Sequence, residues 1–207
     1  MLFELTHRLP DKCVVAVSGG VDSMCALYWL LRGSCDVKGV VHISHNTPFS
    51  TEAKTFVQEV CSMERIPCRE FAISKKPPKN KSLEEFWRDQ RYKVFDKFNT
   101  DVVLAHNMDD CLEEYIMATM IRGYPGTIPY RHGQCIRPFR QWTRASITNY
   151  ARKNNIPYLE DPSNEDVSFK RNFIRHEIVP KIKMLNPGIY KIVKKAIDRQ
   201  DQFDKAD

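Results

Sequence analysis

Short apolar runs rich in β-branched residues alternate along the chain with longer segments whose apolar residues recur at helical spacing. This alternation is typical of βαβ units built around a parallel sheet. The runs that predict strands are residues 12–17, 37–42, 68–73, 101–105 and 135–139. The pattern therefore predicts an α/β fold, with a Rossmann-like, mostly parallel five-stranded sheet and helices on both of its faces.

Helical spacing fills the gaps between these runs, at residues 24–32, 51–65, 82–98 and 109–122. Ser82 and Glu85 form a capping-box pattern at the start of the third helix. Strand signals fade from about residue 143, where residues 143–154 and 170–185 read as helical and a third helix follows Pro187. We therefore predict one domain over residues 1–142 and a small helical C-terminal extension over residues 143–207.

Composition excludes several classes of protein. The chain is 42% hydrophobic and 28% charged, with a mean hydropathy of −0.48. Its apolar stretches, such as residues 25–31, are far shorter than the roughly 18 residues of a membrane span. The first residues show no secretory leader, and the seven cysteines contain no C-x-x-C pair. We expect a cytoplasmic protein without a membrane partner, a disulfide framework or a zinc ribbon.

Positive charge is concentrated in two segments. The formal net charge is +6. Residues 131–155 hold six basic residues and no acidic one, namely Arg131, Arg137, Arg140, Arg144, Arg152 and Lys153. The loop SKKPPKNK (residues 74–81) adds four lysines. These segments predict a local basic patch that contacts nucleic-acid phosphates.

The motif SGGVDS (residues 18–23) lies where a predicted strand ends and a helix begins. Its glycines allow a sharp turn, and the helix N-terminus presents free N–H groups, so the segment suits a phosphate or pyrophosphate. It matches neither the Walker A nor the dinucleotide pattern, and no lysine follows the glycines. Ser18 and Ser23 offer hydroxyl donors, and Asp22 offers a ligand for Mg²⁺. The alternative is a simple tight turn between strand and helix.

Four further blocks accompany this motif: SLEEFWRDQRY (82–92), LAHNMDDCLEE (104–114), IRPFR (136–140) and EDPSNEDVSFKRNFIRHEIVPKI (160–182). With SGGVDS as the PP-loop, they resemble the N-type ATP pyrophosphatases, specifically the tRNA(Ile)-lysidine synthetase family, over about residues 13–187. The resemblance implies that ATP adenylates O2 of the wobble cytidine in a tRNA with a CAU anticodon. The ε-amine of free L-lysine then displaces AMP to give lysidine. A cradle without a phosphate-activating lysine suits attack at the α-phosphate with pyrophosphate leaving.

The resemblance also implies roles for individual residues. The residues implied to bind ATP are Ser18, Gly19, Gly20, Val21, Asp22, Ser23 and His106. Those implied to be catalytic are Asp22, Arg88, Asp110 and Glu113, of which Asp110 and Glu113 also bind lysine. Contacts to tRNA or phosphate are expected from Arg91, Arg137, Arg140, Arg171 and Arg175. Asp22 is the expected Mg²⁺ ligand.

Several of these residues have a structural alternative. Asp110 and Glu113 are three apart and share one helix face, but acidic residues in a first turn also cap helices. Arg88 lies four residues after Glu84, so an intrahelical ion pair competes with a phosphate contact. Trp87 and Trp142 suit base stacking or, more simply, burial, and burial is also the simpler reading of Cys111.

Two features depart from the family pattern. After the second strand the chain reads HISHNTPFS, which keeps His42 and His45 but lacks the arginine that many members have. The chain also resembles a minimal form without the C-terminal tRNA-binding domain, so tRNA selection would rest on the core, the basic segments or a second subunit of a homodimer. Rival readings are a tRNA thiolase of the same superfamily and a non-catalytic nucleotide-binding or RNA-binding module.

Overall fold

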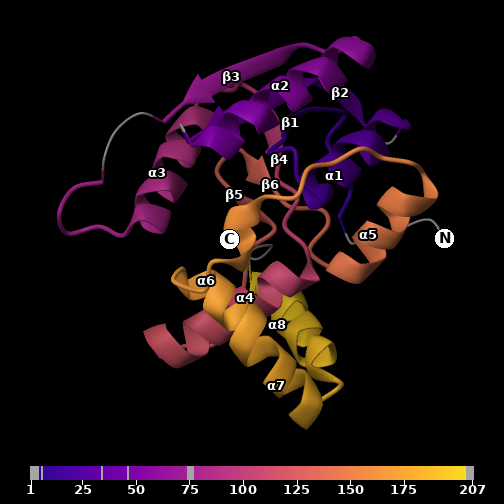
Figure 1. Ribbon diagram of the computed structural model, residues 1–207. Coiled ribbons are helices and arrows are strands. Elements are labelled where there is room, and N and C mark those ends of the chain that lie inside the picture. The colour runs from indigo at the N-terminus through magenta and orange to yellow at the C-terminus, as the bar shows by residue number, and fades with distance from the viewer. Residues whose placement is uncertain (1–4, 6, 34, 46, 74–76, 204–207) are drawn as a thin grey trace.

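The computed structural model describes residues 5, 7–33, 35–45, 47–73 and 77–203, apart from the side chains of Glu84 and Phe203. Within these ranges, one sheet has the strand order β3-β2-β1-β4-β6-β5 (Figure 1). The strands are β1 (Lys12–Ala16), β2 (Asp36–Ser44), β3 (Cys68–Ala72), β4 (Asp101–Val103), β5 (Arg131–His132) and β6 (Cys135–Ile136). Neighbouring strands are parallel except for the pair β5 and β6. The predicted α/β class, the five strands and the mostly parallel sheet are confirmed.

The strand β5 is the part of the sheet that the sequence pattern missed. It contributes two residues and pairs antiparallel with β6, where Arg131 lies opposite Ile136. Gly133 has a φ of 56°, a left-handed conformation that glycine adopts easily, and it turns the chain between the two strands. A two-residue strand carries no periodicity, so only the pairing partner identifies it.

Helices cover both faces of the sheet, as predicted. On one face, α1 (Val21–Leu31), α2 (Pro48–Met63) and α5 (Arg144–Lys153) pack against the side of β1 that presents Val15. On the other face, α3 (Leu83–Phe95) packs against the side that presents Val14. Successive strand residues point to opposite faces, so one apolar strand supplies both cores. Ser82 caps α3 as predicted, because its Oγ accepts a hydrogen bond from the Glu85 N–H at 3.2 Å.

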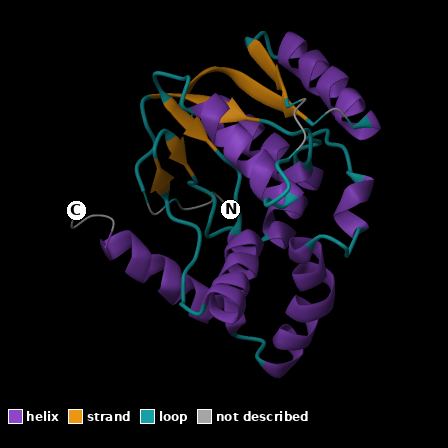
Figure 2. Cartoon of the chain, turned by 90° about the vertical axis from the view of Figure 1, so that its left-hand side faces the viewer, coloured by secondary structure: helices purple, strands orange, loops and turns teal. Residues whose placement is uncertain are grey.

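The last helices pack on α4 (Met108–Met117) instead of on the sheet. They are α6 (Lys170–Phe173), the π-helical turn η3 (Ile174–Ile178), α7 (Val179–Leu185) and α8 (Ile189–Phe203). Their shared core includes Cys111 and Leu112 of α4 with Val193 and Ile197 of α8. Figure 2 shows this group of helices below the strands. Helices therefore follow the last strand, although the first of them, α5, belongs to the core of the sheet. The division into a domain over residues 1–142 and an extension over residues 143–207 stays a prediction.

The helix α4 continues into a second π-helical turn, η1 (Ala118–Arg122), which ends at Gly123. Gly123 has a φ of 77° and so closes the helix in the left-handed conformation. None of the described helices has both the length and the apolar composition of a membrane span.

Candidate active site

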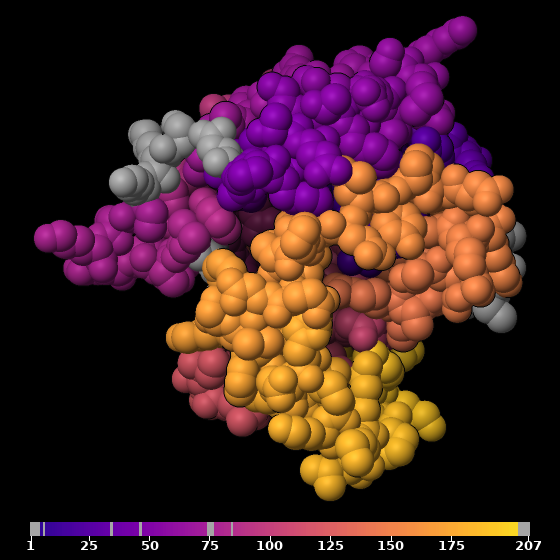
Figure 3. All heavy atoms as spheres, in the orientation of Figure 1, coloured from indigo at the N-terminus to yellow at the C-terminus, as the bar shows by residue number. Residues whose placement is uncertain are grey.

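Two loops meet at the carboxyl ends of the neighbouring parallel strands β1 and β4. Residues 18–20 lead from β1 into α1, and residues 104–107 lead from β4 into α4. The chain runs outward from β1 to β2 and β3 and returns to β4 on the other side of β1, so the strand order reverses here. Ligands of open α/β sheets bind at such switch points. Figure 3 shows this face hollowed, with indigo atoms of the first part of the chain visible between orange segments.

The turn over residues 18–20, here called the glycine turn, is fixed by hydrogen bonds. Ser18 N donates to Ser23 Oγ at 3.1 Å, and Ser23 Oγ donates to Gly20 O at 2.9 Å. From another segment, Leu159 N donates to Gly19 O at 2.9 Å. The N-cap of α1 is Gly20, which has no side chain to cover the N–H groups of the first helical turn. These groups and the positive end of the helix dipole suit a phosphate.

Replacing Gly19 by alanine is expected to destabilise the glycine turn. Gly19 has a φ of 93°, which L residues rarely adopt, while an added Cβ would make only ordinary contacts with Phe56, Ala53 and Val57 at 3.6 to 3.7 Å. The cost therefore comes from the backbone and amounts to about 1–3 kcal/mol. Urea unfolding measures it, and Gly20→Ala is the matched control because Gly20 has an ordinary φ of −75°. Equal losses in the two variants would contradict this account of the turn.

Carboxylates from two helices come together beside the glycine turn, with Arg144 between them. The Nη2 atom of Arg144 lies 3.6 Å from Asp22 Oδ2 in α1 and 3.3 Å from Asp110 Oδ1 in α4. Asp110 also caps its helix, since its Oδ2 accepts a hydrogen bond from Asn107 N at 2.9 Å. One oxygen of Asp110 therefore caps α4, as the structural alternative predicted, and the other faces the charged cluster. Its role in binding lysine stays a prediction.

Glu113 lies behind Asp110 and is 1% exposed. Its carboxylate accepts two hydrogen bonds from Arg175, from Nε at 2.7 Å and from Nη2 at 3.1 Å. Arg171 Nε is 3.1 Å from the same carboxylate. A two-pronged guanidinium–carboxylate pair is among the stronger polar contacts in proteins. The structure thus brings together three predicted residues, Glu113, Arg171 and Arg175, and ties α4 to α6 and η3 through them.

Asp22 is the predicted residue that suits a divalent cation. Burial raises the pKa of its carboxyl to about 6, Arg144 opposes that shift and Asp110 adds to it. The buried Oδ1 atom of Asp22 has no hydrogen-bond partner among the described residues. A buried, unpartnered carboxylate oxygen next to a phosphate-type turn fits Mg²⁺, which takes one or two carboxylates together with phosphate oxygens.

Arginines surround His106 at the end of β4. Burial is the largest cause that lowers the pKa of His106 well below its usual value, and the positive charges of Arg137, Arg171, Arg91 and Arg88 add to it. The side chain of Arg91 reaches solvent. Partial desolvation by the surrounding protein nevertheless lowers the pKa of Arg91, and the positive charges of Arg171 and Arg88 lower it further. Like charges gathered in this way are stabilised by a bound anion. The surroundings of His106 at the end of β4 are therefore electropositive.

Arg88 and Arg137 contact Tyr92 from different sides. The guanidinium of Arg88 lies over the Tyr92 ring, 5.7 Å from its centroid, and the side chain is exposed. Its predicted partner Glu84 has a side chain outside the described residues. Arg137 is 1% exposed and donates to Tyr92 Oη at 2.6 Å and to Pro129 O at 3.0 Å. Arg88 is thus accessible to a ligand, whereas Arg137 is buried and contributes its positive charge near His106 from within the protein.

Arg140 lies in the core and not at a surface that a phosphate could reach. It is 2% exposed and donates from Nη2 to both carboxylate oxygens of Asp201 at 2.8 Å, and from Nη1 to Ile128 O at 2.9 Å. Asp201 belongs to α8. This contact joins the segment after β6 to the last helix, a position different from the phosphate contact that the sequence suggested.

The predicted basic patch over residues 131–155 does not form as one surface. Arg137 and Arg140 are buried. Arg131 pairs with Asp101 at 2.6 Å, and Arg144 pairs with Asp110. The prediction of a single patch is therefore wrong, because partners distant in sequence neutralise or bury most of its cations. In the lysine loop, residues 74–76 lie outside the described residues, and Lys81 pairs with Asp89.

Arg144 is the site residue that sequence reasoning missed. From the sequence, Arg144 counted only as one of six basic residues in the segment 131–155. A local signal was available, because Thr143 Oγ1 caps α5 by accepting a hydrogen bond from Ser146 N. That Thr-x-x-Ser pattern places Arg144 at the first position of α5. Of the other candidates, Trp87 stacks with His45 at 4.5 Å between ring centroids, while Trp142 and Cys111 are buried, at 5% and 0% exposure.

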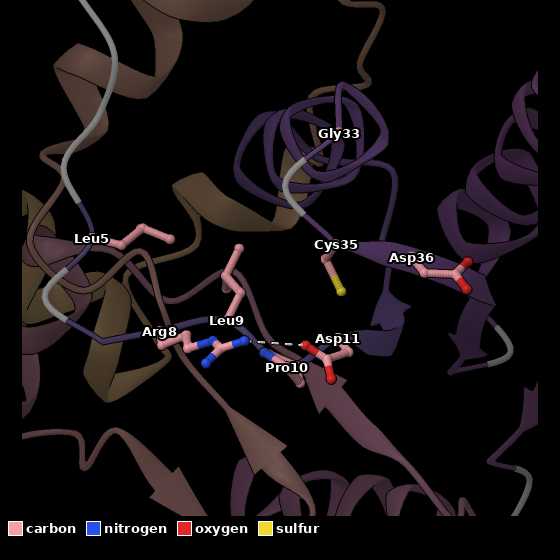
Figure 4. A pocket seen from close by; sticks show the side chains of 8 residues that line it. All are labelled: Leu5, Arg8, Leu9, Pro10, Asp11, Gly33, Cys35 and Asp36. Atoms are coloured by element: carbon pink, nitrogen blue, oxygen red, sulfur yellow. Dashed lines mark ion pairs between the residues drawn. The ribbon is translucent and has the colours of Figure 1, made fainter.

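A separate hollow of about 510 Å³ lies near the amino ends of β1 and β2 (Figure 4). Its polar side chains include Arg8 and Asp11, which form a solvent-exposed pair at 3.6 Å. Exposed pairs of this kind contribute little energy. The hollow lies at the end of the strands opposite the glycine turn and adds no group to the site.

The fold and the site together define a class: an α/β protein with a lysine-free phosphate turn that lies beside a cluster of carboxylates and arginines. Comparison with known families agrees with this class. The family model described as the PP-loop domain matches residues 3–182, and the chain belongs to this family.

Individual relatives are more specific. The chain is 36% identical over 203 residues to the tRNA(Ile)-lysidine synthase of Thermotoga maritima, covering 88% of this chain and 49% of that protein. It is 33% identical over 200 residues to the tRNA(Ile)-lysidine synthase of Nitrosomonas europaea, covering 89% and 43%. The chain thus spans about half the length of these relatives. Among solved structures, the U34-tRNA thiolase NcsA of Methanococcus maripaludis has a similar fold, with a TM-score of 0.70, 15% identity, and coverage of 92% of this chain and 72% of that one.

Proposed function

We propose that the protein is an ATP-dependent tRNA-modifying enzyme that joins L-lysine to C2 of the wobble cytidine in a tRNA with a CAU anticodon. The products are lysidine, AMP and pyrophosphate. The observation that carries the proposal is the meeting of a phosphate turn with an acidic cluster through Arg144, which lies within 3.6 Å of both Asp22 and Asp110. The names of the two relatives above support the same reaction.

In the first step, cytidine O2 attacks the α-phosphate of ATP and pyrophosphate leaves. The N–H groups of the first turn of α1 and the hydroxyl of Ser18 hold the leaving pyrophosphate. Ser23, predicted as a second hydroxyl donor, donates its only hydroxyl proton to Gly20 O and so fixes the glycine turn instead. Arg88 and Arg91, whose positive charges lie near His106, stabilise negative charge on the α-phosphate. Mg²⁺ held by Asp22 would screen the phosphate charges when bound.

In the second step, the ε-amine of lysine attacks C2 and AMP leaves. The amine must lose a proton to become a nucleophile, and a neighbouring carboxylate both attracts the ammonium group and accepts that proton. Asp110 is placed for this role, since its Oδ1 faces the cluster beside Asp22. Glu113, buried and paired with two arginines, supports the lysine site from behind, and its direct contact with lysine requires Arg175 to move.

The tRNA contacts are proposed for Arg91, Arg171 and Arg175. Arg137 is buried and adds its positive charge to theirs without direct contact. These four side chains come from α3, from α6, from η3 and from the segment after β6, so they enclose the site from several directions. Guanidinium groups suit phosphates because they donate paired hydrogen bonds. A cytoplasmic location and a homodimer, in which a second subunit contributes to tRNA selection, belong to the same proposal.

A tRNA thiolase is the second candidate, and the fold of NcsA gives it support. NcsA carries a [4Fe-4S] cluster, which cysteine thiolates hold in proteins. Here all seven cysteines are described, and Cys111, which lies in α4 beside the acidic cluster, is fully buried among apolar side chains. No group of three or more possible metal ligands was found in the described part of the chain. The cysteine positions therefore favour lysine ligation.

The proposed function is tested by incubating the protein with ATP, Mg²⁺, radiolabelled lysine and a tRNA transcript with a CAU anticodon. We expect label in the RNA and one pyrophosphate released for each lysine incorporated. A transcript with a CAG anticodon is the matched control and should remain unlabelled. Pyrophosphate release that does not depend on lysine, or sulfur incorporation in place of lysine, would refute the proposal.

A further inference from the structure

Arg144 stands between the phosphate turn and the lysine site, held there by its backbone. The Arg144 N–H donates to Asp109 Oδ2 at 2.8 Å, and Met108 N donates to Trp142 O at 2.8 Å. These two hydrogen bonds tie residues 142–144 to the first turn of α4. Because the backbone is fixed, the guanidinium reaches the cluster at a small entropic cost compared with a free surface side chain.

Arg144 contacts the oxygen of Asp110 that lysine needs under the proposed function. Its Nη2 lies 3.3 Å from Asp110 Oδ1, closer than the Nη2 of Arg175 at 3.7 Å. Asp110 Oδ2 is already committed to the helix cap. Arg175 is committed to Glu113 through two hydrogen bonds. An incoming ammonium group therefore competes for Asp110 mainly with Arg144.

Phosphate bound at the glycine turn changes this balance. Asp22 is the second residue of α1, so an anion held by the first-turn amides lies beside it, and Arg144 Nη2 is 3.6 Å from Asp22 Oδ2. The side chain of Arg144 is 32% exposed. A triphosphate carries more charge than one carboxylate and accepts paired hydrogen bonds from arginine. Nucleotide binding thus draws Arg144 towards the phosphates and frees Asp110 Oδ1.

We propose that Arg144 is a positioning residue that couples the two substrates: it blocks Asp110 in the empty site and releases it to lysine when ATP binds. This inference rests on the proposed function. It gives the enzyme an order of binding, with nucleotide before lysine, and it keeps lysine from filling the site unproductively. By linkage, lysine must strengthen nucleotide binding by the same factor.

The test is lysine binding measured by calorimetry with and without a non-hydrolysable ATP analogue and Mg²⁺. In the unaltered protein we expect the analogue to tighten lysine binding about 5- to 50-fold, a usual range for coupling between sites. In Arg144→Met the ratio should fall to within about twofold of one. Lysine binding without the analogue should tighten about 3- to 10-fold in that variant, because the loss of one charge-assisted contact frees Asp110.

Two further variants complete the experiment. Arg144→Lys keeps the positive charge and should keep most of the coupling ratio. Arg69→Met, on the edge strand β3, removes an exposed arginine that packs over Phe98 and should leave the ratio unchanged. This inference alone is overturned if Arg144→Met shows the same ratio of lysine affinities, with and without the analogue, as the unaltered protein. It is also overturned if this variant binds lysine more weakly than the unaltered protein does in the absence of nucleotide. Failure of the unaltered protein to bind lysine at all overturns the proposed function, and this inference with it.

Discussion

Lysine incorporation is expected to fall about 1,000-fold in Asp110→Asn, because the half-buried carboxylate that attracts the ammonium group and accepts its proton is lost. Asparagine has the shape of aspartate, and its side-chain oxygen can still accept the hydrogen bond from Asn107 N that caps α4. What the change removes is the negative charge facing Arg144 and the incoming ammonium group. Binding of an ATP analogue should stay within about threefold of the unaltered value, since the glycine turn is untouched.

The measurement pairs radiolabelled lysine incorporation with calorimetric titration of the ATP analogue. Asp198→Asn is the control for the loss of one carboxylate, because Asp198 is 45% exposed on α8 and pairs with Lys194. That variant should retain full incorporation. If ATP affinity collapsed together with lysine incorporation in Asp110→Asn, Asp110 would belong to the nucleotide site, and its assignment to lysine would be wrong.

The elements that the sequence predicted well are those with their own periodicity. The apolar run at β1 alternates its contacts between two cores, and helix α1 repeats Leu27 and Leu30 at helical spacing. The starts of some helices also follow from local signals, such as the Ser82 cap of α3. The short strand β5 and the π-helical turns depend on tertiary pairing, and nothing local in their residues announces them.

The site shows the same division. Strand ends that meet at a switch point bring Asp22 and Asp110 together, so motifs at those ends could be combined from the sequence. Charge counting could not tell which arginines face solvent. Arg140 pairs with Asp201, which lies 61 residues further along the chain, and Arg144 pairs with Asp110, 34 residues before it. Only the packing of α4, α5 and α8 decides between a phosphate contact and an internal ion pair.

Replacing Arg140 by methionine is expected to lower the free energy of unfolding by about 3–5 kcal/mol, the usual cost of breaking a buried ion pair from one side. Methionine fills much of the same space, but Asp201 would keep a negative charge in a site where its side chain is 9% exposed. The imidazole of His7 also lies near this carboxylate, with Nε2 3.7 Å from Asp201 Oδ2. Urea unfolding followed by fluorescence measures the loss.

The matched control is Arg131→Met, which breaks an ion pair of similar geometry at the surface. Arg131 donates to both oxygens of Asp101 at 2.6 and 3.0 Å, but its side chain is 50% exposed, so solvent replaces the lost contact. Its loss should cost about 1 kcal/mol or less. A double variant, Arg140→Met with Asp201→Leu, should recover most of the stability because no buried charge is left unpaired. If Arg140→Met cost no more than Arg131→Met, the pair with Asp201 would not fasten α8 to the sheet, and Arg140 would be available to bind phosphate as its sequence motif suggested.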